Sequence, residues 1–483
     1  MSATYPLDLL HPSGRVERTM LLGEHCPRYP MPAGTTRASR DVDLALVAPS
    51  PADLRERRWL EHAADEAARS LGEHGLAYVR VPRRLRRAAR RELQGAGLVL
   101  ESPLVHLPNT DAPRYLLPLR TEPWRHALGR LIAARPLSRR VLLTTQALPF
   151  GNTILAYAMP AVGIVARRPG ADPLTAWVAL LGGETRETTD AVVATSWRGP
   201  EASVVLHCFA PGEADPWGVA KVAEGSSSEA ERLDRVGVTA RTAGVRVPRR
   251  LANGRLDRRS VVVESVVPGH PVADMLMRSP TSFVEVVTAI AAWLERWNVT
   301  TAATESVPRS RLDDEVVARA GDLASLLPGG TSYRSWLAGH CRALEGRDLP
   351  LVAVHNDLTM WNVVLDERGS MGVLDWGEAE ERGLPLTDFF YAIADAAAAC
   401  EGYEDRLDAV RSCFLPGGAR AAVVMPVQDR VAAALGVAPP VVELCFHACW
   451  LRHAQNEQRA GVRGDGSFLD IVRWLARHAA SAG

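Results

Sequence analysis

The sequence predicts an α+β protein in two parts, an α/β domain over residues 1–185 and a second domain over residues 190–483. A chain of 483 residues usually forms two or three domains, each with a core of its own. The polar Gly/Thr stretch "LGGETRETTD", residues 181–190, separates two apolar segments and is typical of a boundary. Before it, strand-type and helix-type segments alternate; after it, β-type segments come first and helical ones follow.

The elements of the first part follow from their hydrophobic periodicity. Alternating or continuous β-branched runs predict strands, and apolar residues recurring every three to four positions predict helices. The order is strand 41–48, helix 51–75, strand 76–81, helix 83–97, and strands 98–107 and 114–119.

The second part reads differently. Its β-type runs lie at residues 202–209, 218–223 and 260–267, and we expect a small lobe over 190–270. The segment "TSFVEVVTAIAAWLERWN", residues 281–298, then opens a largely helical lobe over 271–483, because its apolar positions recur at helical spacing.

Composition excludes several classes of protein. The formal net charge is zero, so no global charge directs the chain toward nucleic acid or an anionic membrane. Seven scattered cysteines argue against a disulfide framework, and no apolar run approaches the ~18 residues of a spanning helix. We therefore expect a cytoplasmic protein with no membrane or nucleic-acid partner; composition does not indicate an oligomeric state.

Lys221 is the only lysine in the chain, within "GVAKVA"; all other positive side chains among the 56 Lys plus Arg are arginine. So strong a preference for arginine should have replaced this lysine as well, unless its position requires a compact charge on a thin stem. Lys221 is therefore a candidate functional residue. The alternative is a surface lysine that escaped the bias.

The segment "LVAVHNDLTMWNVVLDERGSMGVLDWGE", residues 351–378, predicts a compact hairpin of two short strands. Asn362 precedes the first strand and Asp375 ends the second, while His355 and Asp357 lie shortly before. Because a hairpin holds its ends together, these side chains should converge. Oxygen ligands for Mg²⁺ and a carboxylate that accepts a proton are the groups required for phosphoryl transfer from ATP.

"HNDLTMWN" resembles the catalytic loop, and "VLDW" the metal-binding strand, of the aminoglycoside phosphotransferase and choline kinase family, small-molecule kinases with a protein-kinase-like fold. The resemblance covers about residues 190–483 and implies a bilobal kinase-like domain. It implies that Asp357 is the catalytic base, Asn362 and Asp375 hold Mg²⁺, and His355 supports the loop. "GLPLTDFF" resembles the family's G-x-P-x-x-D segment, which implies that Asp388 braces the loop.

The same resemblance implies an ATP site. Lys221 would contact the phosphates and pair with Glu229, with Glu231 as the second choice; Glu264 to Val266 would be the hinge that bonds adenine. The chain departs from the pattern in two places. Asn356 stands where glycine is common, and no glycine-rich loop occurs in residues 195–207, so Gly199 to Ser203 is the best candidate for covering the phosphates.

Two further patterns have simpler explanations. Cys445, Cys449 and His453 fall at i, i+4 and i+8, which could line up zinc ligands, but core packing is the expected meaning. The run "RRLRRAARRE", residues 83–92, carries six arginines, and a solvated helix face over an apolar stripe is preferred to an anionic partner.

Residues 40–120 weakly resemble the second half of a class I methyltransferase, which would make the first part a degenerate remnant without a cofactor; an unrelated α/β accessory domain is the alternative. The sequence therefore predicts an ATP- and Mg²⁺-dependent phosphotransferase acting on a hydroxyl of a small molecule. The acceptor could be an amino sugar, an aminoglycoside, an amino alcohol or a sugar. Glu378, Glu380 and Glu381 could receive a cationic acceptor, although a solvated loop is the commoner meaning of such a run. The main rival is a pseudokinase that binds nucleotide without turnover.

Overall fold

A computed structural model describes the chain over residues 9–23, 36–37, 40–49, 53, 58–107, 114–131, 141, 144–145, 148, 150–158, 162–172, 174–195, 203–224, 228–256, 258–461 and 467–479. It divides into two compact units. Unit 1 comprises residues 1–227 and 250–266, and unit 2 comprises residues 228–249 and 267–483.

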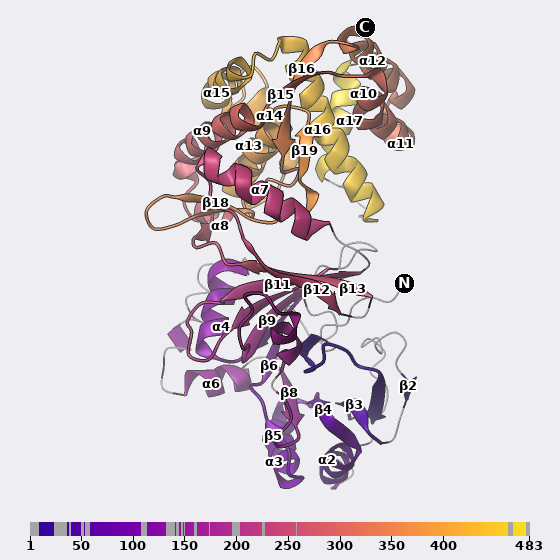
Figure 1. Cartoon of the computed structure of the whole chain (residues 1–483), viewed down its shortest axis with the longest axis vertical. Coiled ribbons are helices and arrows are strands. Elements are labelled where there is room, and N and C mark those ends of the chain that lie inside the picture. The colour runs from indigo at the N-terminus through magenta and orange to yellow at the C-terminus, as the bar shows by residue number, and fades with distance from the viewer. Residues whose placement is uncertain are drawn as a thin grey trace. The chain divides into compact units, whose positions relative to one another are not determined.

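Unit 1 is built on one mixed sheet (Figure 1), whose strand order in the described residues is β12-β13-β11-β10-β9-β7-β6-β8-β4-β3-β1-β2, with β5 paired to β8. Its strands are β1 (Arg18–Leu22), β2 (Thr36–Arg37), β3 (Val42–Val47), β4 (Leu71–Val79), β5 (Val99–Leu100), β6 (Leu104–Leu107), β7 (Tyr115–Pro118), β8 (Val162–Arg167), β9 (Asp190–Thr195), β10 (Val204–Phe209), β11 (Gly218–Glu224), β12 (Arg250–Leu256) and β13 (Arg259–Ser265). Its main helices are α2 (Trp59–Ser70), α3 (Arg86–Gly95), α4 (Thr121–His126) and α6 (Gly151–Ala158).

Strand β3 is apolar from Leu44 to Val47 because both faces of the sheet are covered there. In β3, Ala45 and Val47 pack under α2 and α3, while Leu44 and Leu46 belong to the core on the opposite face. The strands β3 and β4 are parallel and joined through α2, which is the α/β alternation that the sequence predicts. The likeness to a methyltransferase half stays a prediction.

One predicted boundary in this part is wrong. The helix expected over residues 51–75 is α2, which ends at Ser70, and β4 already begins at Leu71. Gly72 and Gly75 weaken any helix here, and Leu71 pairs with Val42 of β3 across a bulge. The arginine-rich helix α3 buries Ala89 and Leu93 as expected, but it buries Arg86 as well.

The sheet does not stop at the predicted domain boundary. Strand β9 follows the 181–190 segment, yet it pairs antiparallel with β7 on one side and β10 on the other. Residues on both sides of that segment therefore share one sheet. The division into domains at 185 and 190 stays a prediction, and the compact units separate elsewhere.

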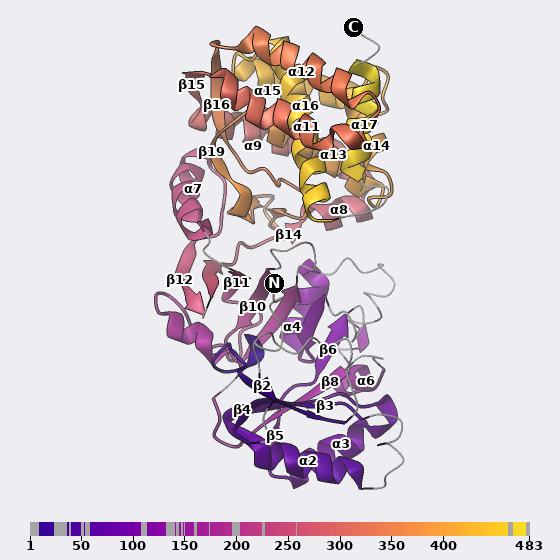
Figure 2. The same cartoon turned by 90° about the vertical axis from the view of Figure 1, so that its right-hand side faces the viewer.

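Unit 2 is mainly helical (Figure 2). Its helices are α7 (Glu229–Ala243), α8 (Val272–Arg278), α9 (Phe283–Thr301), α10 (Arg309–Leu312), α11 (Arg319–Leu323), α12 (Gly330–Leu344), α13 (Thr387–Cys400), α14 (Arg406–Phe414), α15 (Ala421–Ala434), α16 (Pro439–Arg459) and α17 (Ser467–Ala479). Its short strands are β14 (His270–Pro271), β15 (Ala303–Ser306), β16 (Asp348–Val354), β17 (Val363–Leu365), β18 (Met371–Val373) and β19 (Glu380–Gly383).

A single large core organises unit 2. The helix α13 lies in it along almost its whole length, because nearly all of its residues other than Asp388 and Asp395 are apolar. After residue 190, the antiparallel strands β9 to β13, interrupted by α7, are followed by a helical lobe that carries one hairpin. The predicted α+β, protein-kinase-like fold is confirmed for residues 190–483.

Within the described residues, no single helix has the length and apolar character needed to cross a membrane. The pair α15 and α16 meets those criteria only jointly, and it is bent by 112°.

Candidate functional site

The hairpin brings its two ends together as expected. Val363 pairs with Val373, and just beyond this pair the backbone N–H of Leu374 donates to the carbonyl of Asn362 at 2.8 Å. Asn362 and Asp375 thus flank the open end of β17 and β18. At the closed end Gly369 has φ +72°, the left-handed conformation that a tight turn requires and that glycine adopts without strain.

The loop from His355 to Asn362 is held from below by α13. The two carboxylate oxygens of Asp388 accept hydrogen bonds from the backbone N–H groups of His355, at 2.6 Å, and Asn356, at 2.9 Å. Asp388 is buried in the first turn of α13. The residue for which a bracing role is predicted therefore contacts the loop directly.

His355 connects the loop to the strand that carries Asp375. Its Nδ1 accepts from the backbone N–H of Asp357 at 3.2 Å, so the proton must lie on Nε2, which donates to the carbonyl of Leu374 at 2.8 Å. The ring is fully buried and meets Trp376 edge-on, with centroids 4.6 Å apart. These bonds require a neutral imidazole with one tautomer.

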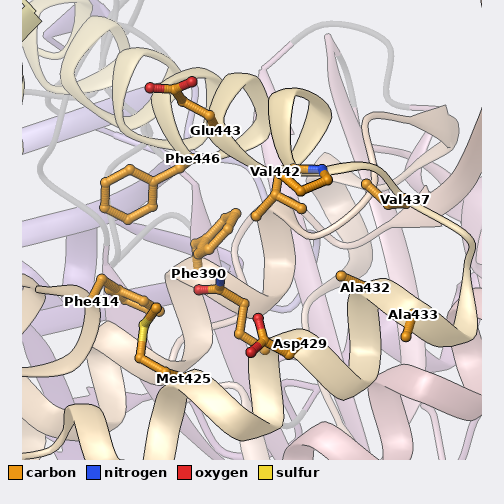
Figure 3. Close-up of a pocket in the computed structure, with 12 residues that line it drawn as sticks. Phe390, Phe414, Met425, Asp429, Ala432, Ala433, Val437, Val442, Glu443 and Phe446 are labelled. Atoms are coloured by element: carbon orange, nitrogen blue, oxygen red, sulfur yellow. The ribbon is translucent and has the colours of Figure 1, made fainter. Parts of the chain in front are cut away.

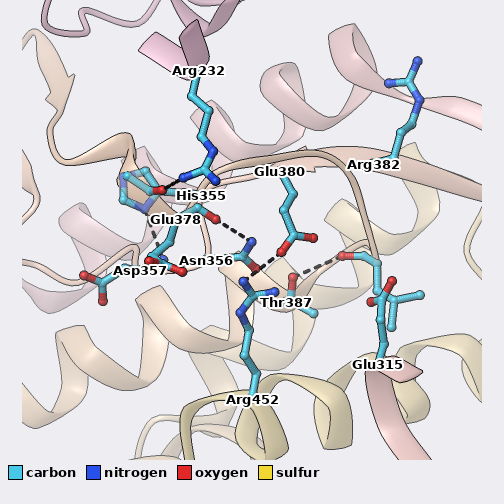
Figure 4. A network of polar contacts seen from close by, with 12 residues as sticks. Arg232, Glu315, His355, Asn356, Asp357, Glu378, Glu380, Arg382, Thr387 and Arg452 are labelled. Carbon is cyan, nitrogen blue, oxygen red and sulfur yellow. Dashed lines mark hydrogen bonds and ion pairs between the residues drawn. The ribbon is translucent and has the colours of Figure 1, made fainter. Parts of the chain in front are cut away.

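Asn356 explains the departure from glycine at the second loop position. Its φ is +65°, a left-handed conformation that asparagine tolerates better than other residues with a Cβ. Its side-chain Nδ2 donates to the carbonyl of Glu378 at 3.0 Å (Figure 4). Asparagine therefore supplies the backbone geometry and adds a tie that glycine lacks.

Asp375 shares this unusual conformation, with φ +60°, two residues after β18 ends. Aspartate is also among the residues that adopt it most readily. The turn that follows is held by the guanidinium of Arg232 on α7, which donates to the carbonyl of Gly377 (Figure 4). The backbone from Asp375 to Gly377 is thus held by its own geometry and by a contact from another helix.

Asp357 lies half-buried at the centre of these contacts. Its Oδ2 accepts from Nδ2 of Asn362 at 3.2 Å, and Tyr391 Oη donates to its Oδ1 at 3.4 Å. The pKa of Asp357 is raised to about 7, mainly by burial and then by the charges of Asp375 and Asp395, while the hydrogen bond from Asn362 acts in the opposite direction. A carboxyl that titrates near neutral pH suits a general base.

Sequence reasoning missed Asp395, which braces the loop a second time. Its side chain is 1% exposed; it accepts from the backbone N–H of Met360 at 2.7 Å and from Tyr403 Oη at 3.0 Å, and pairs with Arg406 at 2.8 Å. Asp388 and Asp395 are seven residues apart, two helical turns, on one face of α13. Two acidic residues seven positions apart in an otherwise apolar helix are the pattern from which this second brace could have been predicted.

Asp395→Asn should lower the free energy of unfolding by about 1–3 kcal/mol, because an amide cannot accept from all three donors and leaves one buried group unpaired. Chemical denaturation measures this directly. Asp408→Asn, at an exposed position of α14, is the matched control and should stay within about 0.5 kcal/mol of wild type. Equal unfolding midpoints for the two variants would contradict the bracing role.

Lys221 lies on β11 in unit 1. Ala220 and Val222 face the core, so Lys221 faces the opposite side of the sheet. Its Nζ lies 3.1 Å from Oε1 of Glu264, with the two side chains 14% and 5% exposed. Val219 pairs with Glu264 and Lys221 with Val262, so the ion pair is a diagonal contact across β11 and β13. The sequence predicts a role only for the backbone of Glu264, in bonding adenine, and does not predict this side-chain ion pair.

The remaining predicted residues lie in several places. Glu229 is the first residue of α7, in unit 2. Its carboxylate and that of Asp375 both lie near Gly377: a Cβ added to this glycine would be 3.7 Å from Oε1 of Glu229 and 3.9 Å from Oδ1 of Asp375. Ser203 precedes β10, whereas residues 199–202 lie outside the described residues. Val266 is the last residue of unit 1. The pairing of Lys221 with Glu229 stays a prediction.

Two of the three acidic residues between Asp375 and Arg382 are paired with arginines. Glu380 pairs with Arg452 at 2.8 Å, and Glu381 pairs with Arg235 at 2.5 Å. Figure 4 shows the Glu380 and Arg452 side chains directed at one another. These contacts reduce the negative charge that a cationic acceptor would meet.

The donor set at the hairpin fits Mg²⁺. No group of three or more His, Cys, Asp or Glu side chains suited to a metal occurs in the described part of the chain. Mg²⁺, however, is commonly held by one or two protein oxygens together with substrate phosphates and water. Asn362 and Asp375 supply such oxygens, and the Nδ2 of Asn362 is already engaged with Asp357, which leaves its Oδ1 for a cation.

The zinc pattern on α16 has a packing explanation. Cys445 and Cys449 are buried in the main core of unit 2. His453 stacks on Tyr391 with ring centroids 3.7 Å apart and planes 12° from parallel. Burial lowers the pKa of His453 to about 3, so the stacked ring is neutral.

Comparisons with known proteins were made for the whole chain. Residues 217–422 match the model of the phosphotransferase enzyme family. A comparison with curated proteins found no match. Among solved structures, the chain is similar to the aminoglycoside phosphotransferase APH(3'')-Id from Streptomyces rimosus, at 19% identity over 53% of this chain and 91% of that one, with a TM-score of 0.33.

Two further solved structures are similar at lower identity. A thermostable mutant of aminoglycoside phosphotransferase APH(4)-Ia, in a ternary complex with ADP and hygromycin B, is 14% identical over 61% of this chain and 93% of that one, with a TM-score of 0.41. A proposed fructosamine-3-kinase from Haemophilus somnus is 9% identical over 59% of this chain and 90% of that one, with a TM-score of 0.39.

Proposed function

With residues 217–422 matched by the phosphotransferase enzyme family, the resemblance expected from the sequence is confirmed, and we propose that the chain transfers the γ-phosphate of ATP, with Mg²⁺, to a hydroxyl of a small molecule. One observation carries the proposal. Asp357 is held by bonds to its neighbours, its pKa is raised to about 7, and it lies beside the oxygen donor Asn362.

The polar residues of the loop and the hairpin, and those that support them, each have a role in this proposal. Asp357 accepts the proton of the acceptor hydroxyl and orients its oxygen. Asn362 and Asp375 would hold Mg²⁺, which when bound neutralises charge on the phosphates. His355, Asp388 and Asp395 keep the loop in one conformation. By family resemblance, Lys221 contacts the phosphates, Glu229 assists it, Glu264 to Val266 bond adenine, and Ser203 belongs to the phosphate-covering segment.

The class of acceptor is proposed only broadly. A polycationic aminoglycoside would be favoured by unpaired carboxylates near Asp357, but Glu380 and Glu381 are paired with arginines. Exposed ion pairs contribute only about 0–1 kcal/mol each, so these contacts leave an amino sugar, an amino alcohol and a neutral sugar open.

A screen for ADP release that depends on the acceptor tests the proposal. Purified full-length protein with Mg²⁺ and ATP is offered hydroxylated metabolites and aminoglycosides one at a time, and each rate is compared with the acceptor-free rate. We expect at least one acceptor to raise ADP release and to gain a phosphate by mass. Metal-dependent nucleotide binding with no acceptor-dependent turnover would favour the pseudokinase instead.

Lys221→Arg should raise the KM for ATP by about tenfold, or about 1.4 kcal/mol, although the charge is kept. The wider, planar guanidinium cannot occupy the position of Nζ beside Glu264, whose site is nearly closed to solvent. Steady-state kinetics measures the change. Arg255→Lys, the reverse exchange at an exposed position of β12, is the control and should leave the KM unchanged. Wild-type kinetics for Lys221→Arg would show that arginine serves equally well there.

Activity should rise with pH through about 7, the raised pKa of Asp357, because only the ionised carboxylate accepts a proton. Stability has the opposite sign. The folded state holds this proton up to a higher pH than the unfolded chain does. The contribution to stability is therefore present below the ordinary carboxyl pKa of 3.8 and is lost as pH rises through about 7. A profile of kcat/KM against pH, with an acceptor of fixed charge, tests the first statement. A rate independent of pH from about 5.5 to 8.5 would contradict it.

A further inference from the structure

A cavity in unit 2 lies among α13, α14, α15 and α16, and no residue of the loop or the hairpin lines it. Its volume is about 490 Å³, within the range of roughly 300–1,000 Å³ that is usual for small-molecule sites. Figure 3 shows three phenylalanine rings, from three helices, gathered at one side of it. These rings are Phe390 on α13, Phe414 at the end of α14 and Phe446 on α16.

The three rings form a mutual edge-to-face cluster. Phe390 and Phe446 have centroids 5.0 Å apart, and Phe414 lies 5.4 Å from each of them. Phe390 is buried, whereas Phe414 and Phe446 are half-buried and border the open space. In such clusters the electron-rich ring faces that are not covered by neighbours attract positive charge.

The charges around the cavity are of one sign. Asp429 on α15 and Glu443 on α16 contribute carboxylates from helices on opposite sides, and Gln428 adds a neutral polar group. The described residues that line the cavity include no lysine, arginine or histidine. Glu443 also lies 3.5 Å from Nε2 of His340 outside the lining, whereas Asp429 makes no ion pair among the described residues.

We propose that this cavity binds an organic cation with a compact apolar body and one ammonium group. The apolar body would lie against the Phe414 and Phe446 rings, and the ammonium group would be attracted by the ring faces and by Asp429 at the opening. An anion would meet two carboxylates, and a neutral apolar compound would gain nothing from them. The lining of the cavity therefore favours a ligand of positive charge as well as of small size.

This site is separate from the proposed phosphotransfer and does not depend on it. Phe390 and Tyr391 are consecutive on α13, so their side chains point about 100° apart around the helix. Tyr391 reaches Asp357, while Phe390 packs against Phe446. Nucleotide and acceptor are not required for the cation to bind.

Calorimetric titration of the full-length protein with three probes of similar size tests the proposal. The probes are benzyltrimethylammonium, neutral benzyl alcohol and anionic phenylacetate. We expect measurable binding of the ammonium compound, in the absence of ATP, and clearly weaker binding of the other two. Equal affinity for all three, or no binding of the ammonium compound, would overturn the proposal.

Variants locate the binding. Asp429→Asn should weaken the ammonium compound by about twofold to fivefold, and Phe446→Leu by about threefold to thirtyfold, whereas Phe446→Tyr keeps a ring and should bind like wild type. Glu285→Gln, an exposed acid on α9, should change nothing. Melting temperatures for each variant separate lost binding from lost folding.

Two results of this series would count against the site. If Asp429→Asn and Phe446→Leu fold and bind the ammonium compound as wild type does, the cation binds elsewhere. If the wild-type chain is a dimer in solution and Phe446→Leu is a monomer, the cavity is covered by a second copy of this chain and is not a ligand site.

Discussion

Asp357→Ala should lower kcat by about 10² to 10⁴ while leaving the Kd for nucleotide nearly unchanged. In the proposed mechanism Asp357 accepts the hydroxyl proton and aligns the oxygen with the γ-phosphate. The substitution removes this group but leaves Lys221, Asn362 and Asp375 in place. Rates with an acceptor found by the screen, together with nucleotide titrations, measure the two quantities separately. In the absence of an acceptor, slow phosphate transfer to water serves as the assay.

Glu367→Ala, at an exposed position in the turn of the same hairpin, is the matched control and should retain wild-type kcat. Parallel loss of nucleotide affinity and activity in Asp357→Ala would make Asp357 a metal-binding or structural residue. Retention of both would contradict the catalytic assignment of the whole loop from His355 to Asn362.

Asp375→Asn should abolish most Mg²⁺-dependent binding of ATP while the protein stays folded. The substitution removes the charged oxygen that is proposed to bind Mg²⁺ but keeps the shape of the side chain. Asparagine also tolerates the left-handed backbone at this position, where φ is +60°, so the turn into Trp376 should persist. Nucleotide titrations with and without Mg²⁺ measure the loss, and thermal unfolding checks the fold.

The same variant has a second readout. The charge of Asp375 is one of the causes that raise the pKa of Asp357, so its removal should move the acid limb of any residual activity to lower pH. A melting temperature that falls in step with activity, with the pH profile unmoved, would instead identify Asp375 as a structural residue.

The local part of the site could be predicted from the sequence because its residues are close in the chain. His355 to Asp375 span one loop and one hairpin, and a hairpin of known strand length has few ways to place its ends. The contact from Leu374 to Asn362 follows directly from that pairing. Asp388 was identified by resemblance to a short motif, and its contacts to the loop show how α13 supports it.

The contacts that connect distant segments could not be predicted in this way. One partner of Lys221 is Glu264, and this pairing depends on the register of β11 against β13. The second brace, Asp395, depends on how α13 packs under the loop. Both are set by long-range packing, for which the local pattern of apolar and polar residues carries little information.

The sequence by itself determined that this chain carries a phosphotransferase-type loop and hairpin, a single lysine on a strand, and two parts of different character. Only the tertiary structure decided that β9 to β13 continue the sheet of the N-terminal part through β7, that α7 packs with the helical unit, and that three phenylalanines and two acids line a cavity. The physical reason is that spacing and turn chemistry act over a few residues. Sheet order, helix packing and cavities depend instead on which apolar surfaces of the whole chain are buried together.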